Sequence, residues 1–149
     1  MYLCHKANRL DLLGRDADEQ VQLYTTLGVL KDAHPVYVGY VYRTYGEGSF
    51  DEALGKHREF IRSIKGYLKK FDGLLGEKKF ICGDGLVWLD FALADFFQTL
   101  NLLEPLLFDD FPNLLVYQKR VWGVPELKNY FESERWIERP CNNVVGKWK

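Results

Sequence analysis

The chain has 149 residues, of which 47% are hydrophobic and 15% aromatic, and its formal net charge at pH 7 is −1. This length and apolar content exclude a disordered chain and predict one domain over residues 1–149 with a single core. The 20 basic residues are scattered rather than gathered in one stripe. Nucleic acid and anionic lipid are therefore not expected partners.

The sequence also lacks the patterns of membrane, secreted and metal-binding proteins. No stretch reaches the roughly 18 uninterrupted apolar residues of a transmembrane segment, and the first residues lack the apolar core of a signal peptide. Three widely spaced cysteines are too few for a disulfide framework, and they form no metal-ligand spacing with the three histidines. We therefore expect a cytoplasmic protein with no metal and no cofactor.

The chain opens with residues 1–14, MYLCHKANRLDLLG, which we interpret as a short helix. Tyr2, Leu3, Ala7 and Leu10 form an apolar stripe along it. Because monomers rarely leave large apolar patches exposed, we expect a second copy of the chain or another protein to cover the face from Tyr2 to Leu10.

A long helix is predicted from residue 16 to about residue 45, starting with acidic residues that favour a helix N-terminus. Pro35 is expected to kink or break it, since proline lacks the N–H group and crowds the preceding turn. Pro35, Val38, Tyr42 and Tyr45 recur at intervals of three and four residues and would share one face.

The next helix is predicted over residues 49–76. Ser49 and Glu52 have the spacing of a capping box, and Gly76 is suited to the C-terminal end. Apolar residues follow at intervals of three and four over the whole segment. His57 lies on this stripe, and we interpret it as a packed residue at the edge of the core rather than a metal ligand.

Residues 80–95, FICGDGLVWLDFALAD, place a carboxylate inside an apolar helix. Gly83 and Gly85 predict a tight turn, and helical spacing starts near Val87. With Val87 as the N-cap, Asp90 is the third helical residue, where its carboxylate can reach back to free N–H groups. We therefore predict that Asp90 is a structural cap, and that this nearly all-apolar helix is the most buried one.

Two shorter helices are predicted near the C-terminus. Pro112 suits the first turn of one and Gly123 its end, and Pro125 starts another that runs to about Glu134. The tail beyond it has no helical period. Since no alternating β-branched run stands between turn signals, the predicted fold class is all-α, with about six helices.

Four of these segments resemble parts of one known family. The Gly-Asp turn before Asp90, followed by DDFPNL at residues 109–114, is similar to the C-terminal helical domain of soluble glutathione transferases. Residues 31–42, KDAHPVYVGYVY, residues 102–120, and SERWIERP at residues 133–140 resemble the mu class of that family. Val87 stands where the family has a hydroxyl residue.

The resemblance implies a wall that binds hydrophobic electrophiles for conjugation to glutathione. Tyr42 matches the tyrosine whose hydroxyl donates to the electrophile or product, and Val38 matches a small apolar pocket residue. Pro35 takes another pocket position, and Asn142 and Asn143 fall where the family's tail supplies pocket residues. Asp32 matches the carboxylate that reaches the glutathione amine across a homodimer.

The resemblance covers nearly the whole chain but begins where the family's first domain ends. That thioredoxin-like domain supplies the tyrosine that activates the glutathione thiol, and no residue here matches it. We therefore expect no catalytic residue in this chain, and glutathione as co-substrate only where a thioredoxin-like domain is supplied. Two alternatives stay open: a non-catalytic structural or interaction subunit of a larger assembly, and a binder of hydrophobic ligands.

Overall fold

The computed structural model describes residues 2–139, 141–142 and 145–148, and their regular structure is helical. Those residues form no β-strand beyond one isolated bridge between Phe80 and Gly83. The prediction of an all-α fold with six helices is confirmed. The helical elements are α1 (Tyr2–Lys6), η1 (Leu10–Leu13), α2 (Ala17–Gly39), η2 (Tyr40–Thr44), α3 (Phe50–Leu75), α4 (Trp88–Leu103), η3 (Pro105–Phe108), α5 (Pro112–Trp122) and α6 (Pro125–Phe131).

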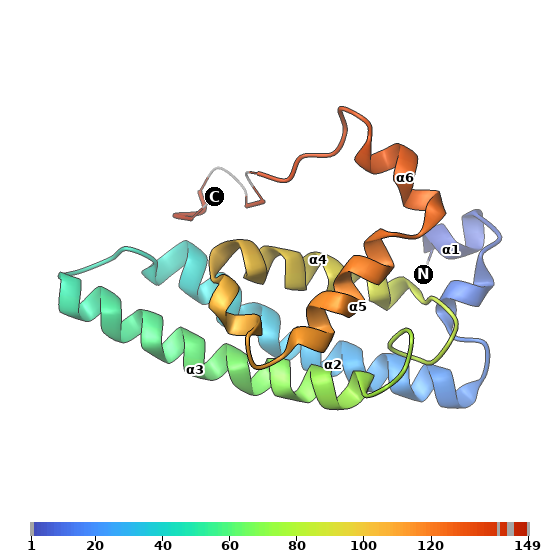
Figure 1. The fold of residues 1–149 in the computed structure, drawn as a ribbon, viewed down its shortest axis with the longest axis horizontal. Coiled ribbons are helices and arrows are strands. Elements are labelled where there is room, and N and C mark those ends of the chain that lie inside the picture. The colour runs from blue at the N-terminus through green and yellow to red at the C-terminus, as the bar shows by residue number, and fades with distance from the viewer. Residues whose placement is uncertain (1, 140, 143–144, 149) are drawn as a thin grey trace.

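The two longest helices, α2 and α3, lie side by side along the length of the molecule, and α4 and α5 pack over them (Figure 1). The closest packing is between α2 and α3 and between α4 and α5. As predicted, α4 is the most buried helix: Leu93 is inaccessible to solvent and Phe91 is half-buried. The buried residues of α4 are Leu89, Asp90, Leu93, Ala94, Phe96, Phe97 and Leu100.

The long second helix starts as predicted, with Asp16 as the N-cap accepting from the Glu19 N–H at 2.9 Å. Of the predicted kink or break at Pro35, the break is wrong, because α2 runs through Pro35 to Gly39. Pro35 is exposed, so water can satisfy the carbonyl that its missing N–H leaves unpaired. The helix continues as the wider turn η2, in which the Tyr45 N–H donates to the Tyr40 carbonyl at 2.8 Å.

Residues 1–14 do not form one helix as predicted. The helix α1 ends at Lys6, and Asn8 adopts a left-handed backbone with φ of 51°. Asparagine tolerates this conformation better than most residues, so the chain turns here and resumes as η1 at Leu10.

The helix α3 has the predicted ends. Glu52 accepts from the Ser49 N–H at 2.8 Å and the Ser49 hydroxyl accepts from the Glu52 N–H at 3.4 Å, which completes the capping box. Gly76 is the C-cap. His57 is half-buried and packs at the edge of the core, where its Nδ1 lies 2.8 Å from the Tyr40 hydroxyl.

The helices near the C-terminus also start where proline predicts. Pro112 and Pro125 are the first residues of α5 and α6, and Gly123 caps α5. The last helix ends at Phe131, three residues earlier than expected. The Ser133 hydroxyl donates to the Tyr130 carbonyl at 2.7 Å, and this side-chain bond replaces a further helical turn.

Asp90 is a structural cap, with more partners than the sequence indicates. Its carboxylate accepts from the N–H of the N-cap Val87 at 2.7 Å and from the N–H of Ile81 at 2.8 Å. The Tyr117 hydroxyl on α5 also donates to it at 2.6 Å. Burial raises the pKa of Asp90, and these three hydrogen bonds oppose that rise.

Replacing Asp90 with alanine should destabilise the fold by about 3 kcal/mol, because buried donors on three segments would lose their acceptor. Tyr117→Phe should cost less, about 1–2 kcal/mol, since it removes one donor and leaves both N–H bonds. Urea denaturation of both variants measures this difference. Equal midpoints for wild type and Asp90→Ala would contradict the capping role.

Candidate functional site

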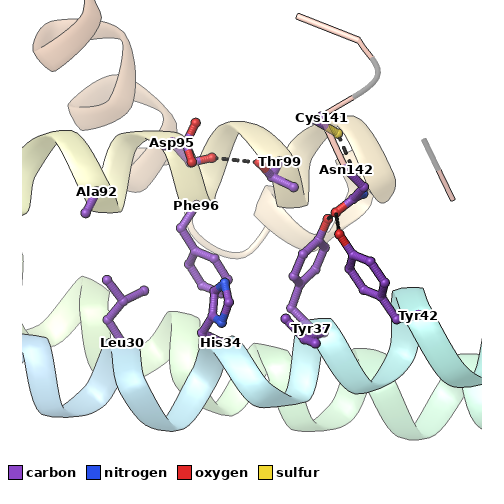
Figure 2. A pocket seen from close by; sticks show the side chains of 11 residues that line it. Leu30, His34, Tyr37, Tyr42, Ala92, Asp95, Phe96, Thr99, Cys141 and Asn142 are labelled. Atoms are coloured by element: carbon purple, nitrogen blue, oxygen red, sulfur yellow. Dashed lines mark hydrogen bonds between the residues drawn. The ribbon is translucent and has the colours of Figure 1, made fainter. Parts of the chain in front are cut away.

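A pocket of about 580 Å³ opens between α2, α4 and the C-terminal tail (Figure 2). One face of α2 forms one wall, and α4 forms the opposite wall. Cys141 and Asn142 of the tail close one end. The lining residues are Leu30, His34, Tyr37, Val38, Tyr42, Ala92, Asp95, Phe96, Thr99, Cys141 and Asn142.

The structure brings Val38 and Tyr42 together in this pocket, where the sequence placed them. It does not bring Pro35 there: Pro35 is exposed and lies one position beyond His34, which takes the lining place. Asp32 is also exposed and does not line the pocket.

The remaining predicted position, Asn143, lies outside the described residues. Its neighbour Asn142 is described and closes the pocket. The tail therefore reaches the site through at least one of the two asparagines singled out from the sequence.

Two tyrosine hydroxyls meet one amide oxygen at the mouth of the pocket. Tyr37 of α2 and Tyr42 of η2 point towards the tail and donate to Oδ1 of Asn142, at 2.8 Å and 3.4 Å (Figure 2). The Asn142 amide nitrogen donates in turn to the Trp148 carbonyl at 3.1 Å. Asn142 thus joins the pocket to the last part of the chain.

Other contacts hold this tail against the helices. The Lys147 N–H donates to the Val41 carbonyl at 3.1 Å, and its ammonium donates to Glu47 at 2.6 Å. Further back, the Arg139 guanidinium donates to the carbonyl of Leu102, at the end of α4, at 3.0 Å. Where it is described, the tail after Phe131 therefore packs against the helices as an irregular segment.

Burial acts on three ionisable groups of the pocket. Burial raises the pKa of the Tyr37 hydroxyl and of the Cys141 thiol. Tyr37 therefore stays protonated as a hydrogen-bond donor, and Cys141 is a poor nucleophile at neutral pH. Burial also raises the pKa of Asp95. The pocket suits an apolar ligand that carries a hydrogen-bond acceptor.

His34, Tyr37 and Asp95 are lining residues that the sequence did not single out. His34 and Tyr37 share the three- and four-residue spacing of Leu30, Val38 and Tyr42, so choosing the face through His34 rather than Pro35 would have found them. Asp95 is a second carboxylate in the apolar α4. A second acidic residue in such a helix, five positions after Asp90, is the sequence feature that could have marked it as a candidate lining residue.

No group of three His, Cys, Asp or Glu side chains in the described ranges is placed to hold a metal ion. In the same ranges, no helix is both long and apolar enough to cross a bilayer. The three cysteines are free thiols.

Comparisons of this chain with protein families, with curated proteins and with solved structures all indicate the same family. Residues 31–134 match the model of the glutathione S-transferase C-terminal domain. Glutathione S-transferase P of Homo sapiens is 29% identical over 144 residues, which are 94% of this chain and 65% of that protein. The class-mu 26 kDa isozyme 51 of Fasciola hepatica is 24% identical over 142 residues, 95% of this chain and 62% of that protein.

Solved structures agree with this match. The Pi-class glutathione S-transferase of Onchocerca volvulus is 27% identical, with a TM-score of 0.77 over 97% of this chain and 68% of that one. The chain spans a little under two thirds of the length of the curated relatives it matches.

Substituting Asn142 with alanine should loosen the tail and leave the helices folded, because the described side chain joins Tyr37 to the Trp148 carbonyl. The buried Tyr37 hydroxyl would lose its acceptor, at a cost of about 1–2 kcal/mol. Hydrogen exchange should show faster exchange in residues 145–148. The exposed Asn129→Ala on α6 serves as the control, and unchanged exchange in both variants would contradict the coupling.

Proposed function

This chain belongs to the family of glutathione transferase C-terminal domains, and from that membership we propose that it supplies the hydrophobic-electrophile side of a glutathione transferase site. The observation that carries the proposal is the pocket between α2, α4 and the tail. Its walls are largely apolar, and its mouth carries the hydroxyls of Tyr37 and Tyr42. A small number of polar groups around an apolar cavity is the usual form of a small-molecule site.

We assign Tyr42 as the hydroxyl that donates to the bound electrophile or its product, and Val38 as an apolar contact. Tyr42 shares the Asn142 oxygen with Tyr37 over a longer distance, 3.4 Å against 2.8 Å. Hydrogen bonds weaken as they lengthen, so of the two bonds to Asn142 the one from Tyr42 is the weaker.

The 149 residues do not activate glutathione by themselves under this proposal. Glutathione reacts as a thiolate, and a free thiol with a pKa of about 8.5 is mostly protonated at neutral pH. An enzyme lowers that pKa with a hydrogen-bond donor aimed at the sulfur. Both pocket tyrosines already donate to Asn142, which supports assigning activation to a thioredoxin-like domain.

The class of glutathione transferase and the partner subunit are further parts of the proposal. Residues 102–120 and 133–140 favour the mu class, although relatives of class mu and class P match this chain to a similar degree. We assign Asp32, exposed on α2, to the amine of glutathione bound in the other subunit of a homodimer. Free cysteines suit a reducing compartment, and we place the protein in the cytoplasm.

The purified 149-residue chain should bind a hydrophobic fluorescent dye but should not conjugate glutathione to chloro-dinitrobenzene above the uncatalysed rate. Val38→Trp should weaken dye binding about tenfold by filling the pocket, whereas Val21→Trp on the exposed face of the same helix should not. Turnover by the chain alone would contradict the assignment of thiol activation to another domain. Equal dye binding by the two variants would contradict the pocket assignment.

One observation favours the second candidate, an interaction subunit. Tyr2, Leu3 and Leu10 at the N-terminal end are 70%, 76% and 50% exposed. Apolar side chains gathered in this way mark protein contacts more often than free surface. A second copy of this chain is the partner we propose for the face from Tyr2 to Leu10.

Sedimentation velocity at micromolar concentration should therefore show a dimer. Replacing both Leu3 and Leu10 with glutamate should yield a monomer, because charges would be buried in the contact. Phe50→Glu is the control, since Phe50 is 81% exposed at the start of α3. A wild-type chain that sediments as a monomer would rule out this interface.

A further inference from the structure

A second, smaller cavity lies next to the pocket described above and shares Asp95 of α4 with it. It has a volume of about 200 Å³ and is enclosed by α4, α5, α6 and the residue Trp136 that follows α6. Five of its lining residues are aromatic. The lining residues are Phe91, Asp95, Val121, Trp122, Leu127, Tyr130, Phe131 and Trp136.

Four of these aromatic rings form one connected cluster. Trp122 stacks on Phe131 with ring centroids 4.6 Å apart. Trp136 stands edge-on to both of these rings at 4.8 Å, and Tyr130 lies 5.8 Å from Trp136. Tyr130 is exposed and the other three rings are half-buried, so the cluster is accessible from solvent. Its electron-rich faces are suited to attract a cation.

Asp95 adds a negative charge to this wall. Its carboxylate stands on the side of α4 away from the α2 residues (Figure 2). It has no hydrogen bond or ion pair with any other described residue, and its backbone carbonyl accepts from Thr99. The pKa of Asp95 is raised by burial as the one cause. Asp95 is exposed at the rim of the cavity, where its carboxylate can be approached by a cation that also contacts the rings.

Within the part of the chain that the structure describes, no lysine or arginine makes a cation–π contact with a ring of this cavity. In the described ranges, the cation–π contacts are those of Lys6, Lys70, Lys79 and Arg139, and they involve the rings of Tyr2, Tyr67, Phe80 and Trp148. None of them uses a ring of the aromatic cavity.

We propose that this aromatic cavity binds a small organic cation with a trimethylammonium or similar alkylammonium head group. Such a group offers methyl surface to the rings and positive charge to both the ring faces and Asp95. The cavity volume of about 200 Å³ suits a head group, since sites for drug-sized ligands start at about 300 Å³. A weakly hydrated alkylammonium also loses less hydration on entry than a lysine ammonium.

The test compares choline with its neutral isostere 3,3-dimethylbutan-1-ol, titrated into the 149-residue chain. Choline should bind at least about fivefold more tightly, because the two differ in charge and hardly in shape. The four tryptophan indole N–H signals in NMR locate the site, with assignment by single Trp→Phe variants. Those of Trp122 and Trp136 should shift, and those of Trp88 and Trp148 should not.

Two variants and two control variants distinguish choline binding in the aromatic cavity from choline binding elsewhere on the chain. Asp95→Asn and Trp136→Leu should each weaken choline binding about fivefold or more, whereas Asp109→Asn and Trp148→Leu should leave it unchanged. Circular dichroism confirms that each variant is folded, and Asp95→Asn preserves the side-chain shape. Equal affinity for choline and the alcohol, shifts confined to Trp88 or Trp148, or no binding of choline in the millimolar range would each overturn the proposal.

Discussion

Inside the core, the Asp90 carboxylate receives hydrogen bonds from the loop before α4, from the first turn of α4 and from α5. The loop can offer the Ile81 N–H because Phe80 and Gly83 bond each other's backbones, at 2.7 and 3.0 Å, and Gly83 adopts a φ of 132°. Three segments are thus fixed to a single side chain. The orientation of α4 follows from this, and with it the direction in which Ala92, Phe96 and Thr99 face α2.

The ends of the helices could be predicted because their signals are local. Ser49 with Glu52, Pro112 and Pro125 act within one turn of the chain, and each marks a helix start in the structure. The same locality explains the capping position of Asp90. Its bond with Tyr117 joins residues 27 positions apart, and no spacing rule specifies such a pair.

The pocket was harder to predict for two reasons. A helix face is defined to within one residue by periodicity, and choosing Pro35 instead of His34 rotates the face by about 100°. One end of the pocket is closed by a tail without periodicity, whose contacts depend on side chains such as Asn142 and Lys147. Val38 and Tyr42 were placed in the pocket by resemblance, which carries tertiary information that periodicity lacks.

The two cavities lie next to each other along α4 and share Asp95. One has tyrosine hydroxyls at its mouth, and the other is lined by aromatic rings. A charge change at Asp95 would therefore act on both cavities.

Because the tail closes one end of the pocket, changes in its sequence can alter the shape of the pocket. Residues 141–148, where described, contribute to the pocket through Asn142 and Cys141, and they contact the helices mainly through backbone groups and surface side chains. The buried core cluster lies in α2 to α5 and the loop before α4, and Trp148 of the tail packs against it. Sequence changes at Cys141 and Asn142 can therefore reshape one end of the pocket while the buried residues of the helices stay the same. The shape of this end of the pocket is set by residues that do not belong to the buried core.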